Sequence, residues 1–165
     1  MELGGAWERV EHARVARLVT IGPDGRPDLV PVTFALDGDT SRARIVIAVD
    51  HKPKTTRRLQ RLANVTDRPD VSLLIDHYDD DWSTLWWIRL DGRARVVPVD
   101  DIDVLVAKYA PYQDLRPAGP VIEIEITSWQ WWSAADGAGH AVAHAPRPSP
   151  SPSPSPSIPF SPEDP

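Results

Sequence analysis

The chain has no cysteine, and this absence excludes disulfide bonds, thiolate catalysis and cysteine-ligated metal centres. No apolar run reaches the roughly 18 residues that a membrane-spanning helix needs. The N-terminal sequence MELGGAWERVEH also lacks the apolar stretch of a signal peptide. We therefore expect no membrane association and a cytoplasmic location.

Several motifs that carry chemistry are missing as well. Neither G-x-G-x-x-G nor G-x-x-x-x-G-K-[ST] occurs, H-E-x-x-H is absent, and no serine has the context of a nucleophile elbow. His140 and His144 are spaced like metal ligands on a helix but lie in a low-complexity segment, so we expect no metal site. The net charge of −6 at pH 7 disfavours nucleic acid as a partner, because phosphate backbones would repel the protein.

The C-terminal part differs in composition from the rest of the chain. Beyond about residue 135 it is rich in Ala and Pro, and Ser-Pro repeats occupy residues 149–157. Such a segment buries too little apolar surface to offset the entropy lost on ordering. We predict one globular domain over residues 1–135, followed by a disordered Ala/Ser/Pro-rich tail over residues 136–165.

Short strands separated by turns dominate the pattern of the predicted domain. Turn pairs such as Asp24-Gly25, and a bend near Asp91-Gly92, indicate hairpins and antiparallel pairing. Helices are expected at the N-terminus, after residue 54 and after residue 100, the last ended by Pro111. We therefore predict a mainly β fold, an antiparallel meander or Greek-key barrel with flanking helices, rather than a parallel α/β sheet. The predicted strands cover residues 15–21, 28–36, 44–49, 71–78, 82–97 and 121–127.

Lysine is rare, and its placement is uneven. The only lysines are Lys52, Lys54 and Lys108, while arginine supplies most other positive charges. Lys52 and Lys54 fall where the predicted helix begins, together with the hydroxyls of Thr55 and Thr56. A helix N-terminus presents unpaired N–H groups and the positive end of its dipole. This turn is therefore a candidate site for a phosphate or carboxylate, although ordinary solvated charges at a helix start would give the same pattern.

Tryptophan is abundant, and six of the seven residues form two clusters along the chain. They would either seal the ends of a small barrel or a subunit interface, or wall a groove for a planar ring. Trp86 and Trp87 are adjacent within a predicted strand, so their side chains should point to opposite faces of the sheet. At most one of these two is expected in the core. The clusters are Trp82, Trp86 and Trp87, and then Trp129, Trp131 and Trp132.

Three stretches of the sequence resemble a known family. They are LVTIGPDGRPDLVPVTF at residues 18–34, DHKPKTT at residues 50–56 and RPDVSLLI at residues 68–75, supported by Trp-Trp-Ile-Arg at residues 86–89. Together they resemble the pyridoxamine 5′-phosphate oxidase-like split β-barrel family. Within it they are most similar to the coenzyme F-420 (deazaflavin)-dependent oxidoreductases of actinobacteria. The likeness covers nearly all of the predicted domain.

This resemblance implies an FMN-binding-like split β-barrel, a homodimer with cofactor grooves between its subunits, and F-420 as the cofactor. The cofactor's own hydride chemistry would reduce a small unsaturated or quinone-like organic molecule, with the protein orienting the reactants. Two alternatives stay open, namely an FMN-dependent reductase or oxidase and a non-catalytic flavin or haem carrier. The Arg-rich C-terminal motif of true pyridoxamine phosphate oxidases is absent, so that specific activity is not expected. By position, the cofactor-anchoring turn would be His51, Lys52, Pro53, Lys54, Thr55 and Thr56, and the groove walls Trp86, Trp87 and Arg89, with Trp132 as a further wall.

Overall fold

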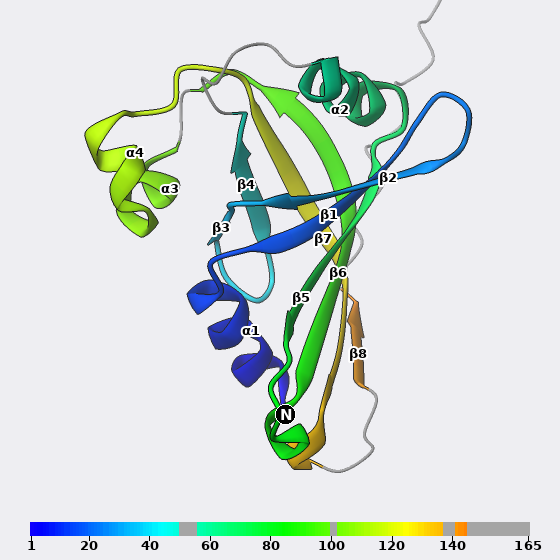
Figure 1. The fold of residues 1–165 in the computed structure, drawn as a ribbon, viewed down its shortest axis with the longest axis vertical. Coiled ribbons are helices and arrows are strands. Elements are labelled where there is room, and N and C mark those ends of the chain that lie inside the picture. The colour runs from blue at the N-terminus through cyan, green and yellow to red at the C-terminus, as the bar shows by residue number, and fades with distance from the viewer. Residues whose placement is uncertain (50–55, 100–101, 137–140, 145–165) are drawn as a thin grey trace, which may run out of the picture.

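The structure is a computed structural model and describes residues 1–49, 56–99, 102–136 and 141–144. Strands hold more of the described residues than helices do, and the helices lie at the periphery (Figure 1). In chain order the elements are α1 (Leu3–His12), β1 (Ala16–Ile21), β2 (Pro27–Val32), β3 (Ala35–Asp37), β4 (Arg44–Ala48), α2 (Thr56–Asp67), β5 (Asp70–His77), η1 (Trp82–Thr84), β6 (Trp86–Val97), α3 (Asp103–Lys108), α4 (Ala110–Asp114), β7 (Val121–Ser133), η2 (Ala134–Asp136) and β8 (Ala141–His144).

The strands form one curled antiparallel sheet. Its order is β2-β1-β5-β6-β7-β4-β3, and β8 pairs with the C-terminal half of β7. Every pairing between described strands is antiparallel, which confirms the predicted mainly β split-barrel class. The long strands β6 and β7 run the full height of the molecule (Figure 1). Strands β5, β1 and β2 follow on the β6 side, and β4 and β3 follow on the β7 side.

The prediction of a single strand over residues 28–36 is wrong, because the strand is interrupted at Thr33 and Phe34, between β2 and β3. β2 pairs with β1 and β3 pairs with β4, so the two pieces lie at opposite ends of the sheet rather than forming a simple meander. The hydroxyl of Tyr109 accepts a hydrogen bond from the Phe34 N–H at 3.1 Å and lies 2.9 Å from the Phe34 carbonyl oxygen. A side chain thus satisfies the backbone where strand pairing stops.

A β-bulge between Asp91 and Gly92 bends β6 against β7, at the position where the sequence predicts a bend. Gly92 is required there, because a Cβ atom on it would lie 2.4 Å from the carbonyl oxygen of Glu125. Because of this bend, the β6–β7 pair takes part in both halves of the barrel, pairing with β5 on one side and with β4 on the other.

Two apolar clusters lie on opposite faces of this sheet. Inward-facing residues of the strands, together with Ala6 and Val10 of α1, form the main core. Helix α3 covers the other face with Leu105, and Ile102, directly before the helix, joins it against Val46 and Val121. The predicted inward set Ile122, Ile124 and Ile126 is confirmed, and each of these residues is at most 2% exposed.

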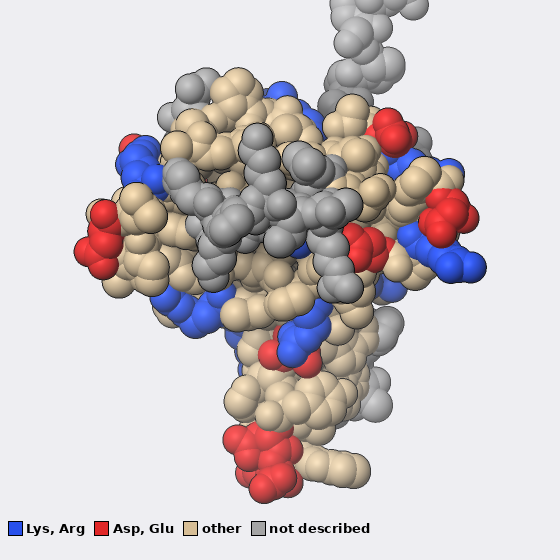
Figure 2. Space-filling model, turned by 45° about the horizontal axis from the view of Figure 1, so that its top comes forward, with Lys and Arg blue, Asp and Glu red and all other residues tan. Residues whose placement is uncertain are grey.

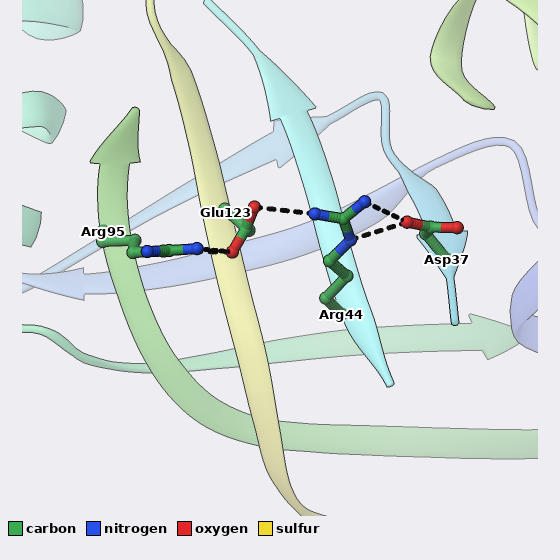
Figure 3. A network of polar contacts seen from close by, with 4 residues as sticks. All are labelled: Asp37, Arg44, Arg95 and Glu123. Atoms are coloured by element: carbon green, nitrogen blue, oxygen red, sulfur yellow. Dashed lines mark hydrogen bonds and ion pairs between the residues drawn. The ribbon is translucent and has the colours of Figure 1, made fainter. Parts of the chain in front are cut away.

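Charged side chains tie the strands together on the outer face of the sheet. Arg44 of β4 contacts Asp37 of β3 and Glu123 of β7, and Glu123 also accepts a hydrogen bond from Arg95 Nε at 3.0 Å (Figure 3). Elsewhere on the described surface, basic side chains lie beside acidic ones (Figure 2). The described face shown there therefore presents no extended basic surface.

Two further features differ from the sequence-based expectations. Pro111 lies in the first turn of α4 instead of simply ending a helix, because proline is tolerated where the N–H has no helical partner. β8 lies within the segment expected to be disordered, and pairs its backbone with the free edge of β7.

Within the described ranges, no helix is long and apolar enough to cross a membrane, and no group of three side chains could hold a metal ion.

Candidate functional site

A depression of about 270 Å³ lies where β4 ends, beside α2 and α4. Figure 1 shows α2 on one side of the end of β4 and α4 on the other. Its apolar lining side chains come from β2, from β4 and from Val49, and we call them the apolar floor. Polar side chains come from the two helices and from the break between β2 and β3, and polar atoms make up more of the exposed lining than apolar atoms. We call this depression the β4 pocket; it is lined by Pro31, Val32, Thr33, Ile47, Ala48, Val49, Arg61 and Tyr112.

Both described flanks of the predicted anion-binding turn border the β4 pocket. Val49, the last described residue before that turn, lines it, and α2, which begins directly after, contributes Arg61. The Val49 N–H donates to the Pro120 carbonyl at 3.1 Å, and a Cβ on Gly119 would lie 2.5 Å from the Val49 carbonyl oxygen. Close packing against residues 119–120 thus fixes the direction in which the chain leaves β4.

The anchoring residues themselves can be located only in part. His51, Lys52, Pro53, Lys54 and Thr55 lie outside the described residues. Thr56 is the first residue of α2, although its side chain is also outside the described part. Their assignment therefore remains a prediction from the sequence.

Helix α2 is held so that Arg61 faces the β4 pocket. Asn64, 2% exposed, donates from Nδ2 to the Thr20 hydroxyl at 3.1 Å and accepts from Gln60 Nε2 at 2.9 Å. Val65, on the next position, is buried in the main core. Residues three and four apart share a helix face, so Arg61 lies on the side of α2 that meets the sheet. Sequence reasoning missed Arg61, although its spacing from Asn64 and Val65 is a usable signal.

Two hydroxyl groups that line another wall of the β4 pocket lie within hydrogen-bond distance of each other. Thr33 Oγ1, from the break between β2 and β3, lies 2.9 Å from the phenolic oxygen of Tyr112 in α4. The ring of Tyr112 makes an edge contact with Tyr109, with centroids 5.6 Å apart. Sequence reasoning missed this pair, because only the tertiary fold brings the two residues together.

Behind this wall lies Lys108, the lysine that stands apart from the predicted turn. Its Nζ is buried, has no hydrogen-bond partner among the described residues and lies 4.2 Å from the centroid of the Phe34 ring. Burial, and secondarily the charge of Arg14, lower the pKa of Lys108 to about 8, although Glu11 opposes the shift. Burial also raises the pKa of Tyr109.

The predicted groove walls lie elsewhere. Trp87 and Arg89 line a second depression of about 330 Å³ with Leu74, Asp76 and Tyr78, which shares no lining residue with the β4 pocket. Its charges are compensated, since Arg89 Nη2 lies 3.0 Å from Asp91 Oδ2 and Asp76 pairs with Arg17.

The remaining tryptophans have distinct positions. Trp86 points to the opposite face from Trp87, as predicted, where it stacks on His77 and lies beneath Arg9, whose Cζ is 4.9 Å from the ring centroid. Trp132 is the cross-strand neighbour of Trp87, whereas Trp129 and Trp131 belong to the main core.

The fold and the β4 pocket define a split β-barrel with a partly apolar, cation-bearing pocket at one end. The chain belongs to the pyridoxamine 5′-phosphate oxidase family, whose model matches residues 6–133. A search of curated proteins gives no match.

Solved structures share the fold at low sequence identity. A conserved hypothetical protein from Mycobacterium tuberculosis is 21% identical with a TM-score of 0.63, over 86% of this chain and 91% of that chain. The FAD binding protein from Mycobacterium smegmatis is 16% identical with a TM-score of 0.54, over 80% of this chain and 94% of that chain. A heme binding protein from Mycobacterium smegmatis is 15% identical with a TM-score of 0.60, over 83% of this chain and 56% of that chain.

Proposed function

We propose that the protein is an oxidoreductase that binds a flavin-type cofactor, coenzyme F-420, in the β4 pocket. This proposal rests on one observation: three features border the same depression, the β4 pocket. The flanks of the predicted anion-binding turn, the cationic side chain of Arg61 and an apolar floor all border one depression. A molecule with an anionic tail and a flat, partly apolar ring matches that combination.

The residues of the chain would divide the work of binding. Lys52, Lys54 and the hydroxyls of Thr55 and Thr56, at the N-terminal end of α2, would hold the anionic part by charge-assisted hydrogen bonds. The apolar side chains of the floor would exclude water from the ring. When bound, the cofactor would supply hydride chemistry to a small unsaturated or quinone-like organic substrate.

Two alternative functions use the same pocket. FMN in place of F-420 would make the protein a flavin-dependent reductase or oxidase, and the structural similarity to a FAD binding protein supports this alternative. A carrier without turnover is the second alternative, supported by the similarity to a heme binding protein. The apolar floor and cationic wall of the β4 pocket suit either flavin or F-420, so the chemistry of binding alone does not separate them.

We also propose a homodimer. The outer face of the sheet exposes apolar side chains: Leu29 is 61% exposed, and Leu74 is 37% exposed beside the half-buried Trp87. A second copy covering this face would remove that apolar surface from water. Trp87 and Arg89 would then lie in or near the subunit interface, whereas Trp86 packs against the core and His77.

Titration of the purified full-length protein with F-420, FMN and haem tests the proposal, read by ligand fluorescence or absorbance. Lys54→Ala should weaken F-420 binding by about 10- to 150-fold, because one charge-assisted contact contributes roughly 1.5–3 kcal/mol. Arg26→Ala is the matched control, since it removes one positive charge from a side chain that is 87% exposed in the β1–β2 hairpin. Equal affinities of wild type and Lys54→Ala would count against the site, and turnover with reduced F-420 would separate an enzyme from a carrier.

A further inference from the structure

The pair formed by Thr33 and Tyr112 has more hydrogen-bonding capacity than the fold uses. Each hydroxyl carries one hydrogen, and a single hydrogen bond joins the two oxygens at 2.9 Å. Neither hydroxyl makes another hydrogen bond to the described residues. Whichever oxygen accepts therefore keeps its own hydrogen available for another acceptor.

Docking of α3 and α4 does not depend on this pair alone. The Tyr109 hydroxyl already ties the helices to the strands, through the Phe34 N–H and the carbonyl oxygens of Phe34 and Arg14. The Tyr112 ring is half-buried against the same apolar cluster as Tyr109. Its packing would be retained by phenylalanine, and what the hydroxyl adds is one hydrogen bond to Thr33 and the unused capacity described above.

If Thr33 donates to Tyr112, the hydrogen of the Tyr112 hydroxyl is available as a donor in the β4 pocket. Thr33 and Tyr112 both line it, and Arg61 lines it from α2, on the other side of the end of β4 (Figure 1). A cation at one wall and a hydrogen-bond donor at another, beside the more exposed apolar side chains of Pro31 and Val49, select a molecule with matching features. That molecule has an anionic tail and a flat ring bearing a carbonyl oxygen or ring nitrogen as acceptor.

We propose that Tyr112, oriented by Thr33, donates a hydrogen bond to the ring of the molecule bound in the β4 pocket, and thereby helps determine which ring is accepted. This inference rests on the proposed function and deepens it, because it assigns a contact to the ring where the predicted lysine turn would contact the tail. No proton transfer is required, and the residue acts by recognition.

The test compares wild type, Tyr112→Phe and Thr33→Val in titrations with FMN and F-420 as probes. Tyr112→Phe should weaken binding of at least one probe by about 3- to 10-fold, as expected for one neutral hydrogen bond. It should also shift the visible absorption maximum of the bound probe, because the ring loses a polar contact. Thr33→Val should shift the same maximum in the same direction, since it removes the group that orients Tyr112.

Tyr109→Phe is the matched control. It removes a phenolic hydroxyl from the same pair of helices but from a side chain that does not line the β4 pocket. It should lower the melting temperature and leave the absorption maximum of the bound probe unchanged. A purely structural role for Tyr112 predicts the same behaviour for Tyr112→Phe as for this control.

The outcomes separate the two proposals. If wild type binds a probe and Tyr112→Phe binds it with the same affinity and the same spectrum, only the role of Tyr112 is overturned. If wild type binds neither probe, the proposed function and the role of Tyr112 are overturned together. A change in affinity with a shifted spectrum, absent in Tyr109→Phe, supports both.

Discussion

Replacing Lys108 with methionine should stabilise the protein at neutral pH, because the lysine charge is held where water is largely excluded. Lowering its pKa from 10.5 to about 8 corresponds to about 3.4 kcal/mol of unfavourable free energy for the charged form. The side chain is partly exposed, so we halve that figure to about 1.7 kcal/mol. The contact of the charge with the Phe34 ring offsets roughly 0.5–1 kcal/mol. The net expectation is that Lys108→Met raises the free energy of unfolding by about 1 kcal/mol at pH 7.

The pH dependence gives the sharper test. Below pH 8 the lysine is charged in both the folded and the unfolded chain, so the whole penalty is present. Between pH 8 and 10.5 the folded protein releases the proton first, and the penalty is progressively relieved as pH rises. The advantage of Lys108→Met over wild type should therefore shrink by about 1 kcal/mol between pH 7 and pH 9.5.

Urea denaturation of wild type, Lys108→Met and Lys108→Arg at the two pH values measures this difference. Lys108→Arg is the control, because arginine keeps its charge throughout this range and should show no relief relative to Lys108→Met. Differencing the variants cancels the other groups that titrate above pH 8. Parallel pH profiles for wild type and Lys108→Met, or a less stable Lys108→Met at pH 7, would refute the reasoning.

Two further predictions concern the bend of the sheet and its outer face. Gly92→Ala should lower the free energy of unfolding by about 1–3 kcal/mol in a denaturation experiment, because its Cβ would meet the Glu125 carbonyl. Gly4→Ala in α1, where a Cβ meets nothing within 4 Å, should instead raise it by about 0.5–1 kcal/mol, and equal effects of the two would contradict the packing argument. Leu74→Glu should convert the proposed homodimer to a monomer in sedimentation analysis, and a monomeric wild type would exclude that assembly.

Much of the fold could be predicted because its signals are local. The alternation in residues 121–127 identifies the inward isoleucines, and Asp91-Gly92 marks the bend in β6. The opposite orientation of Trp86 and Trp87 follows from the period of a strand. The break between β2 and β3 could not be predicted, since it depends on a hydroxyl at Tyr109, 75 residues along the chain from Phe34.

The candidate site was predictable only at its flanks. The lysine-bearing turn is a local pattern, and the structure places Val49 and α2 beside the β4 pocket. Arg61 and Tyr112 reach that pocket through packing between distant elements, which periodicity alone does not reveal. The end of the globular domain at residue 135 remains a prediction, and β8 shows that some later residues join the sheet.

A crystal structure of the protein soaked with F-420 or FMN would test the central claim most directly. The account predicts electron density for the ligand in the β4 pocket, with its anionic part toward α2 and its ring beside Tyr112. Ligand density confined to the second depression, beside Leu74, Trp87 and Arg89, would contradict it.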